Sequence, residues 1–138
     1  MNSVDLHLYT AWLPLICMIP GLFLLLTGWM AKMEGMKKFS MYLFLLAGLF
    51  SLATGMFGGA SMEASKSNPA VDMAALHLHA WSAFGAILFM VIMAFFAYRT
   101  LRNKEKPDQT SLLMMVLIGI LVIAFLAFTI KMAFRIEV

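Results

Sequence analysis

The sequence predicts an all-α integral membrane protein, built as a single four-helix transmembrane domain over residues 1–138. The chain is 63% apolar, whereas soluble domains average roughly 45–50%. Charged residues make up only 12% of the chain, and the mean hydropathy is +0.92. Both observations indicate the lipid bilayer as its environment. The formal net charge of +3 is too small for a nucleic-acid surface, so no nucleic-acid partner is expected.

Four long apolar segments define the expected helices. They run over about 8–31, 39–62, 73–98 and 109–131, and each reaches the roughly 20 residues that a hydrocarbon core requires. Backbone polar groups within lipid must be satisfied inside each segment, and none of the segments alternates like a strand, so helices are predicted. We expect no internal repeat. An even number of spans puts both termini on one side of the membrane.

Basic residues in the connections predict the orientation. Most of them lie between the first and second segments or between the third and fourth: Lys32, Lys37, Lys38, Arg99, Arg102, Lys104 and Lys106. The other side of the membrane receives only Lys66, Lys131 and Arg135. The positive-inside rule makes the first side cytoplasmic and places both termini outside. His7, His77 and His79 then all fall near the outer membrane boundary.

The histidines are the functional candidates, because an ionisable residue at the mouth of a membrane helix is costly and usually has a role. On a helix His77 and His79 point about 200° apart, so they do not address one centre together. The residues three, four and seven positions after His79 are small, whereas bulky aromatic residues follow His77. We predict that His79 is the inward-facing ligand and that His77 lies at the rim. Trp81 belongs either to an interfacial belt or to a pocket wall.

A stripe of small residues follows one face of the second segment. Its members recur every four residues, with one further glycine beside them: Ala47, Ser51, Gly55, Gly59 and Gly58. Two interpretations stay open. The stripe allows another helix to approach closely, or it offers a flat surface to a planar cofactor.

The first segment opens with His7-Leu8-Tyr9-Thr10-Ala11-Trp12-Leu13-Pro14-Leu15. This stretch resembles the His-Pro-x-x-x-His-Phe-Pro-Ile signature of an uncharacterised family of bacterial four-helix membrane proteins. His7 and Pro14 match in register, whereas Leu8 replaces a proline and Trp12 the second histidine. The stretch Ala47–Ala60 and the run from His79 to Arg102 resemble the family's second and third helices. The resemblance implies a multi-pass protein of the bacterial inner (cytoplasmic) membrane that binds b-type haem.

The leading hypothesis is a small b-type cytochrome, in which His7 and His79 ligate haem b near the outer face. Two imidazoles from facing helices are a common way to hold haem iron in a helical bundle. The expected role is electron transfer with a quinone or a periplasmic redox protein, as a subunit of a respiratory or redox complex. The residues expected to line the cofactor are His77, Ser51, Gly55, Gly59 and Trp81.

Two alternatives stay open. Copper is one, because thioether and imidazole ligands bind Cu(I), and Met56, Met62 and Met73 are predicted near the outer face. The other is a non-catalytic accessory or scaffold subunit whose histidines are boundary residues. The sequence contains no phosphate-binding glycine loop, nucleophile elbow or His-Glu-x-x-His motif. We therefore expect an electron-transfer or accessory subunit, as a homo-oligomer or in a larger membrane complex, rather than a stand-alone enzyme.

Overall fold

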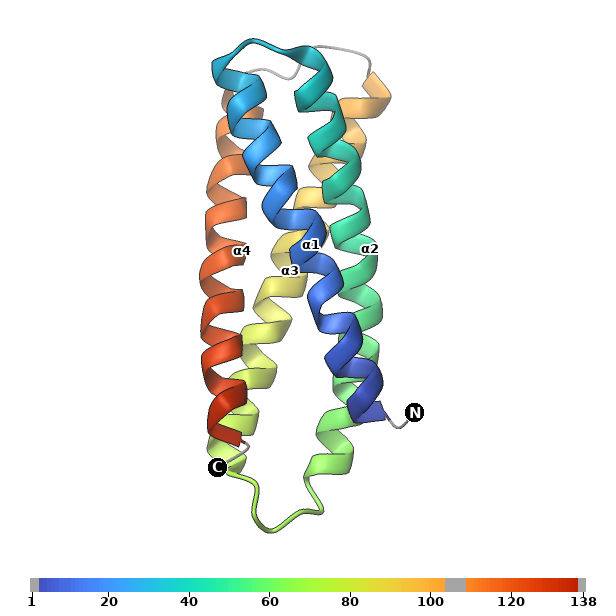
Figure 1. Cartoon of the computed structure of the whole chain (residues 1–138), viewed down its shortest axis with the longest axis vertical. Coiled ribbons are helices and arrows are strands. Elements are labelled where there is room, and N and C mark those ends of the chain that lie inside the picture. Colours follow the sequence, from blue (N-terminus) through green and yellow to red (C-terminus); the bar gives the residue numbers. More distant parts are fainter. Residues whose placement is uncertain (1–2, 104–108, 137–138) are drawn as a thin grey trace.

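The computed structural model describes residues 3–103 and 109–136, and it confirms the predicted all-α membrane bundle (Figure 1). The order of elements is α1 (Ser3–Met30), α2 (Glu34–Ser65), α3 (Met73–Asn103) and α4 (Gln109–Ile136). Each helix is long and apolar enough to cross a membrane. The chain is therefore a multi-pass membrane protein.

The helices extend beyond the predicted segments. α2 begins at Glu34 rather than near residue 39, and α3 continues to Asn103 rather than ending near residue 98. Charged residues mark the edge of the hydrocarbon layer, but a helix continues past that edge wherever its side chains find polar partners. Lys37 does so, because its ammonium lies 2.7 Å from the Glu34 carboxylate.

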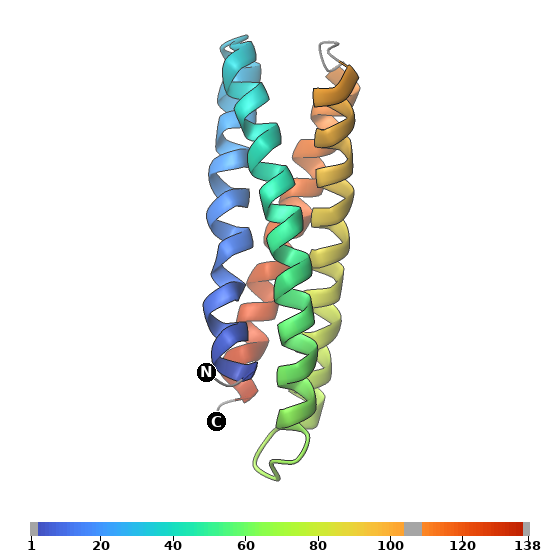
Figure 2. The same cartoon turned by 90° about the vertical axis from the view of Figure 1, so that its right-hand side faces the viewer.

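The bundle consists of two helical hairpins, α1–α2 and α3–α4, which Figure 2 shows from the side. Within each hairpin the two helices pack extensively, and α2 also packs along α3, whereas α1 and α4 make few contacts. In Figure 1, α1 runs obliquely and leaves α4 toward the end where the chain begins and ends. We call this the terminal end of the bundle; it also carries the link between α2 and α3.

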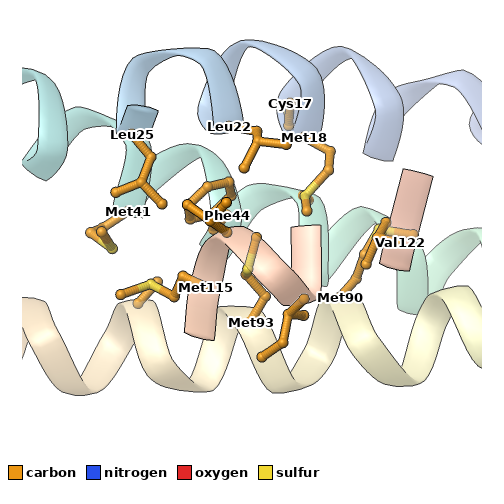
Figure 3. Close-up of a cluster of buried hydrophobic side chains, with 14 of the residues drawn as sticks. Cys17, Met18, Leu22, Leu25, Met41, Phe44, Met90, Met93, Met115 and Val122 are labelled. Carbon is orange, nitrogen blue, oxygen red and sulfur yellow. The ribbon is translucent and has the colours of Figure 1, made fainter. Parts of the chain in front are cut away.

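The hydrophobic core fills the middle of the bundle (Figure 3). Met18, Met93 and Met115 are fully buried there, together with Leu25 and Phe44. Flexible thioether side chains fill irregular gaps between helices. Most of the large apolar side chains that are exposed lie on the lipid-facing surface, as expected of a protein solvated by acyl chains.

Candidate functional site

His7 and His79 lie opposite each other at the terminal end. His7 is in the second turn of α1, and His79 is in the second turn of α3. Their ring centroids are 6.3 Å apart, and the ring planes cross at 87°. Because the rings come from different hairpins, the pair spans the interface between the two halves of the bundle.

Each ring is tethered through the same nitrogen to a backbone carbonyl of the other helix in its hairpin. Nδ1 of His7 lies 3.3 Å from the Thr54 carbonyl oxygen, and Nδ1 of His79 lies 3.0 Å from that of Thr129. A carbonyl oxygen only accepts hydrogen bonds, so Nδ1 carries the proton and donates, which leaves the lone pair on Nε2. Metal-binding histidines are typically held in this way, because the outer hydrogen bond fixes the tautomer and the orientation of the ring.

Hydroxyl groups support the tether in the first hairpin. The Thr54 hydroxyl is 2.9 Å from the carbonyl oxygens of both Phe50, one turn earlier on α2, and Thr10 on α1. The Thr10 hydroxyl in turn donates to the His7 carbonyl oxygen at 3.3 Å. The carbonyl that accepts from His7 is therefore fixed by a bond between α1 and α2.

The second hairpin repeats this arrangement. The Thr129 hydroxyl is 2.8 Å from the Phe125 carbonyl oxygen on its own helix and 2.8 Å from the Ser82 hydroxyl on α3. Ser82 donates to the His79 carbonyl oxygen at 2.9 Å. Ser82 and Thr129 are both buried, so this tether is better shielded than the first.

These parallel networks reveal an internal repeat. His7-x-Tyr-Thr-Ala-Trp on α1 corresponds to His79-x-Trp-Ser-Ala-Phe on α3, and Phe50-x-x-x-Thr on α2 to Phe125-x-x-x-Thr on α4. Buried positions follow the same register along α1 and α3: Pro14 and Ala86, Met18 and Met90, Gly21 and Met93, Leu25 and Ala97. The expectation of no internal repeat is therefore wrong.

The small residues of α2 have different roles. A Cβ atom on Gly58 would lie 3.0 Å from Cε1 of His7, so this glycine makes room for the ring. A Cβ atom on Gly55 would lie 2.8 Å from Ile87 on α3, so Gly55 allows close helix packing. Ser51 is buried and donates to the Gly48 carbonyl oxygen at 2.8 Å. Gly59 is exposed with no neighbour within 4 Å of a Cβ atom, so it does not line the histidine pair.

His77 and Trp81 lie away from the pair. His77 is exposed, and Trp81 has 72% of its surface exposed. With Met62, Ala80 and Phe84 they line an open groove of about 400 Å³. The helical spacing of two residues thus separates His77 from His79, and the structure brings only His79 next to His7.

Burial sets the protonation of His7, which lies just before the membrane-spanning part of α1. Desolvation lowers the pKa of His7; the bond to the Thr54 carbonyl opposes this shift, and the charge of a protonated His79 adds to it. The net shift is downward from a value near 6.5, so the ring is neutral at pH 7 and its Nε2 lone pair is free to bind.

The pair has no further protein ligands close by. Across residues 3–103 and 109–136, no group of three or more His, Cys, Asp and Glu side chains gathers as for a metal ion. Met56 is 78% exposed, Met73 is 40% exposed and Met62 lines the groove.

No protein-family model, curated protein or solved structure matches this chain. The resemblance of its opening stretch to the signature of a bacterial four-helix membrane family thus stays a prediction.

The residues that sequence reasoning missed are the hydroxyl-bearing partners Thr10, Thr54, Ser82 and Thr129. A signal for them exists, because each of the two ligand candidates is followed three positions later by Thr or Ser. A Phe-x-x-x-Thr pattern then recurs on the second helix of each hairpin.

Proposed function

We propose that this chain is a small membrane b-type cytochrome, in which His7 and His79 would hold one haem b. The observation that carries the proposal is the matched pair of tethers, which hold two imidazoles next to each other, with their ring planes crossing at 87°, across the hairpin interface. Haem held by two histidines supplies reversible one-electron transfer. The protein's part is to fix both rings and to shield them from water.

The spacing of the rings supports this assignment. Two imidazoles that shared one metal ion through their Nε2 atoms, at metal–nitrogen bonds of about 2.0–2.1 Å, would have centroids no more than about 6 Å apart. The centroids of His7 and His79 are 6.3 Å apart. The two imidazoles are therefore close enough for both to hold one haem iron.

The packing of the bundle also supports a planar group between the hairpins. α1 and α4 make few contacts, and they separate toward the terminal end, where the histidines lie (Figure 1). This side of the interface opens at a smaller packing cost than the side where α2 meets α3.

The proposal includes a place in the cell. Lys32 in the α1–α2 link, together with Lys37 and Lys38 near the start of α2, supports a cytoplasmic position for the end opposite the histidines. The histidine pair then faces the periplasm, in a bacterial inner membrane. Electrons would pass between the membrane quinone pool and a periplasmic redox protein, with the chain acting as a subunit of a larger complex.

A difference spectrum tests the proposal. Protein purified in detergent from cells that supply haem should show a Soret and an α-band change on reduction with dithionite. The double variant His7→Ala with His79→Ala should lose both bands, whereas His77→Ala serves as the matched control and should keep them. A colourless protein that takes up no added haem, or full haem occupancy in the double variant, would overturn the assignment.

A copper function is the second candidate, and the ring spacing favours it too. Two neighbouring imidazoles also suit Cu(I), which needs no space for a macrocycle. The exposed thioethers of Met56 and Met73 would take no part. Elemental analysis of haem-free protein after exposure to Cu(I) should find one copper per chain, lost in the double variant; no retained copper would end this candidate. A protein that holds neither haem nor copper would be left with the scaffold role.

A further inference from the structure

The groove lined by Met62, His77, Ala80, Trp81 and Phe84 lies on the face of α3 opposite the histidine pair. His77 and His79 are two residues apart, which corresponds to about 3 Å along the helix axis and about 200° around it. The groove opens toward the surroundings of the bundle at the level of the redox site. A molecule within it would be separated from His79 by the width of one helix.

The walls of the groove are apolar and aromatic. The rings of Trp81 and Phe84 pack edge to face, with centroids 6.3 Å apart, and both side chains are mostly exposed. Ala80 leaves free space at the centre, because its side chain is a single methyl group. A flat apolar ring fits such walls better than a flexible chain does, since aromatic side chains favour stacked or edge-on contact with other rings.

Of the five residues that line the groove, only His77 has an ionisable side chain. Within the described part of the chain, neither ring nitrogen of His77 has a hydrogen-bonding partner. An imidazole can donate from one nitrogen and accept at the other. It therefore suits a ligand whose oxygen atom changes between a carbonyl, which accepts, and a hydroxyl, which donates.

The charges near the groove argue against a phospholipid headgroup. The five lining residues include no lysine or arginine, and phosphate recognition generally uses these side chains. The nearby Lys66 is paired with Glu63 at 2.7 Å. The chemistry that remains is that of a lipid-soluble ring with oxygen substituents.

We propose that this groove binds the head group of a membrane quinone or quinol, with His77 hydrogen-bonded to one ring oxygen and Trp81 against the ring. The proposal rests on the proposed redox function, because only an electron-transfer centre next to the groove gives a quinone a role there. The quinone or quinol would be the membrane-soluble redox partner of that centre.

Tryptophan fluorescence tests the binding without any activity assay. A reporter variant with Trp12→Phe and Trp29→Phe keeps Trp81 as its only tryptophan, and a control reporter with Trp29→Phe and Trp81→Phe keeps only Trp12. Both are placed in nanodiscs of phosphatidylcholine and titrated with decyl-ubiquinone. Trp81 should be quenched saturably, whereas Trp12, which lies outside the groove, should show only the linear quenching of quinone dissolved in the bilayer.

Two substitutions in the Trp81 reporter complete the test. Ala80→Phe fills the groove and His77→Leu removes the hydrogen bond, and each should weaken the saturable quenching at least tenfold. Linear quenching of both reporters, or saturable quenching that neither substitution changes, would overturn the groove assignment. The haem spectrum is recorded separately, so a normal spectrum with linear quenching rejects the groove alone. Saturable quenching in a protein that binds no haem rejects the cytochrome and leaves a quinone-binding protein.

Discussion

Each of the two hairpins tethers a histidine ring to a backbone carbonyl, but the two tethers differ in length and burial. In α3–α4 the tether to His79 is 3.0 Å long, and its supporting hydroxyls are buried. In α1–α2 the tether to His7 is 3.3 Å long, and Thr10 and Thr54 are only partly buried. A buried hydrogen bond is harder to replace by water, and leaving its partners unsatisfied costs more. We therefore expect the His79 ring to be the more rigidly held of the two, whereas the His7 ring can adjust its position.

The two interfaces between the hairpins, α2 against α3 and α1 against α4, differ in how closely the helices approach. Where α2 meets α3, a Cβ atom on Gly48 would lie 2.6 Å from Cβ of Ala94. The corresponding positions of the repeat on α4 and α1 are Ile123 and Leu22. Ile123 is exposed, whereas Leu22 is buried and its Cδ1 would lie 2.9 Å from a Cβ atom on Gly119 of α4. The α2–α3 interface is thus tight at Gly48, whereas α1 meets α4 at few positions.

Removing each ligand alone should give the largest effects. His79→Ala should lower haem affinity by more than the roughly 10–100-fold that loss of an outer hydrogen-bonding partner costs. His7→Ala should lower it less, because a haem fixed by His79 stays bound with one protein ligand. Haem titration followed at the Soret band measures both affinities, and the spectrum of His7→Ala should change to that of five-coordinate iron. Equal losses in the two variants would contradict the idea of a fixed and an adjustable ligand.

Gly48→Val should destabilise the bundle most among substitutions outside the ligands. The new side chain would collide with Ala94, and overpacking of this kind costs about 1–3 kcal/mol. Gly35→Val is the matched control, because no atom lies within 4 Å of a Cβ atom at Gly35. Thermal unfolding in detergent, followed by circular dichroism, should show a clearly lower Tm for the first variant only. An equal drop in both would mean that the α2–α3 contact is not tight.

The sequence predicted the fold because membrane spans depend on local composition. Runs without charge, each long enough to cross the hydrocarbon core, identified all four helices. The same reasoning placed their ends wrongly, since Glu34 and Lys37 continue α2 by pairing with each other. Helical geometry separated His77 from His79, because the angle between two residues on one helix needs no knowledge of other helices.

The carbonyl partners of the histidines could not be predicted in this way. Which residue of α2 faces His7 depends on the axial shift between two helices, and packing along their whole length sets that shift. Gly58 illustrates this point, because only its contact with His7 distinguishes it from the neighbouring Gly59. The repeat is difficult to predict from the sequence because it rests on short motifs with few shared residues, and its hydroxyl after the histidine comes from Thr10 in one half and Ser82 in the other.

Gly58→Val tests whether the His7 ring packs against Gly58. The added side chain would overlap the space of the His7 ring, so we expect a loss of about 1–2 kcal/mol in stability and weaker haem binding. Gly59→Val introduces the same side chain at an open position and controls for the low helix propensity of valine. Chemical unfolding of the haem-free protein separates the packing effect from the loss of ligand. If both variants behaved alike, the His7 ring would not rest on Gly58.

Removal of the hydroxyl groups that support the tethers should lower stability least, and the loss should differ between the two hairpins. Thr129→Val keeps the shape of the side chain but removes the bond to Ser82, which in a membrane bundle costs about 0.6–1 kcal/mol. Thr54→Val removes a bond that is less well buried and should cost less. Thr129→Ser restores the hydroxyl and should recover most of the stability and the wild-type midpoint potential of the haem. The potential is the sharper readout, because Thr129 acts on the iron only through the orientation of His79. A potential that is unchanged in Thr129→Val would reduce this network to a purely structural role and make the two hairpins equivalent.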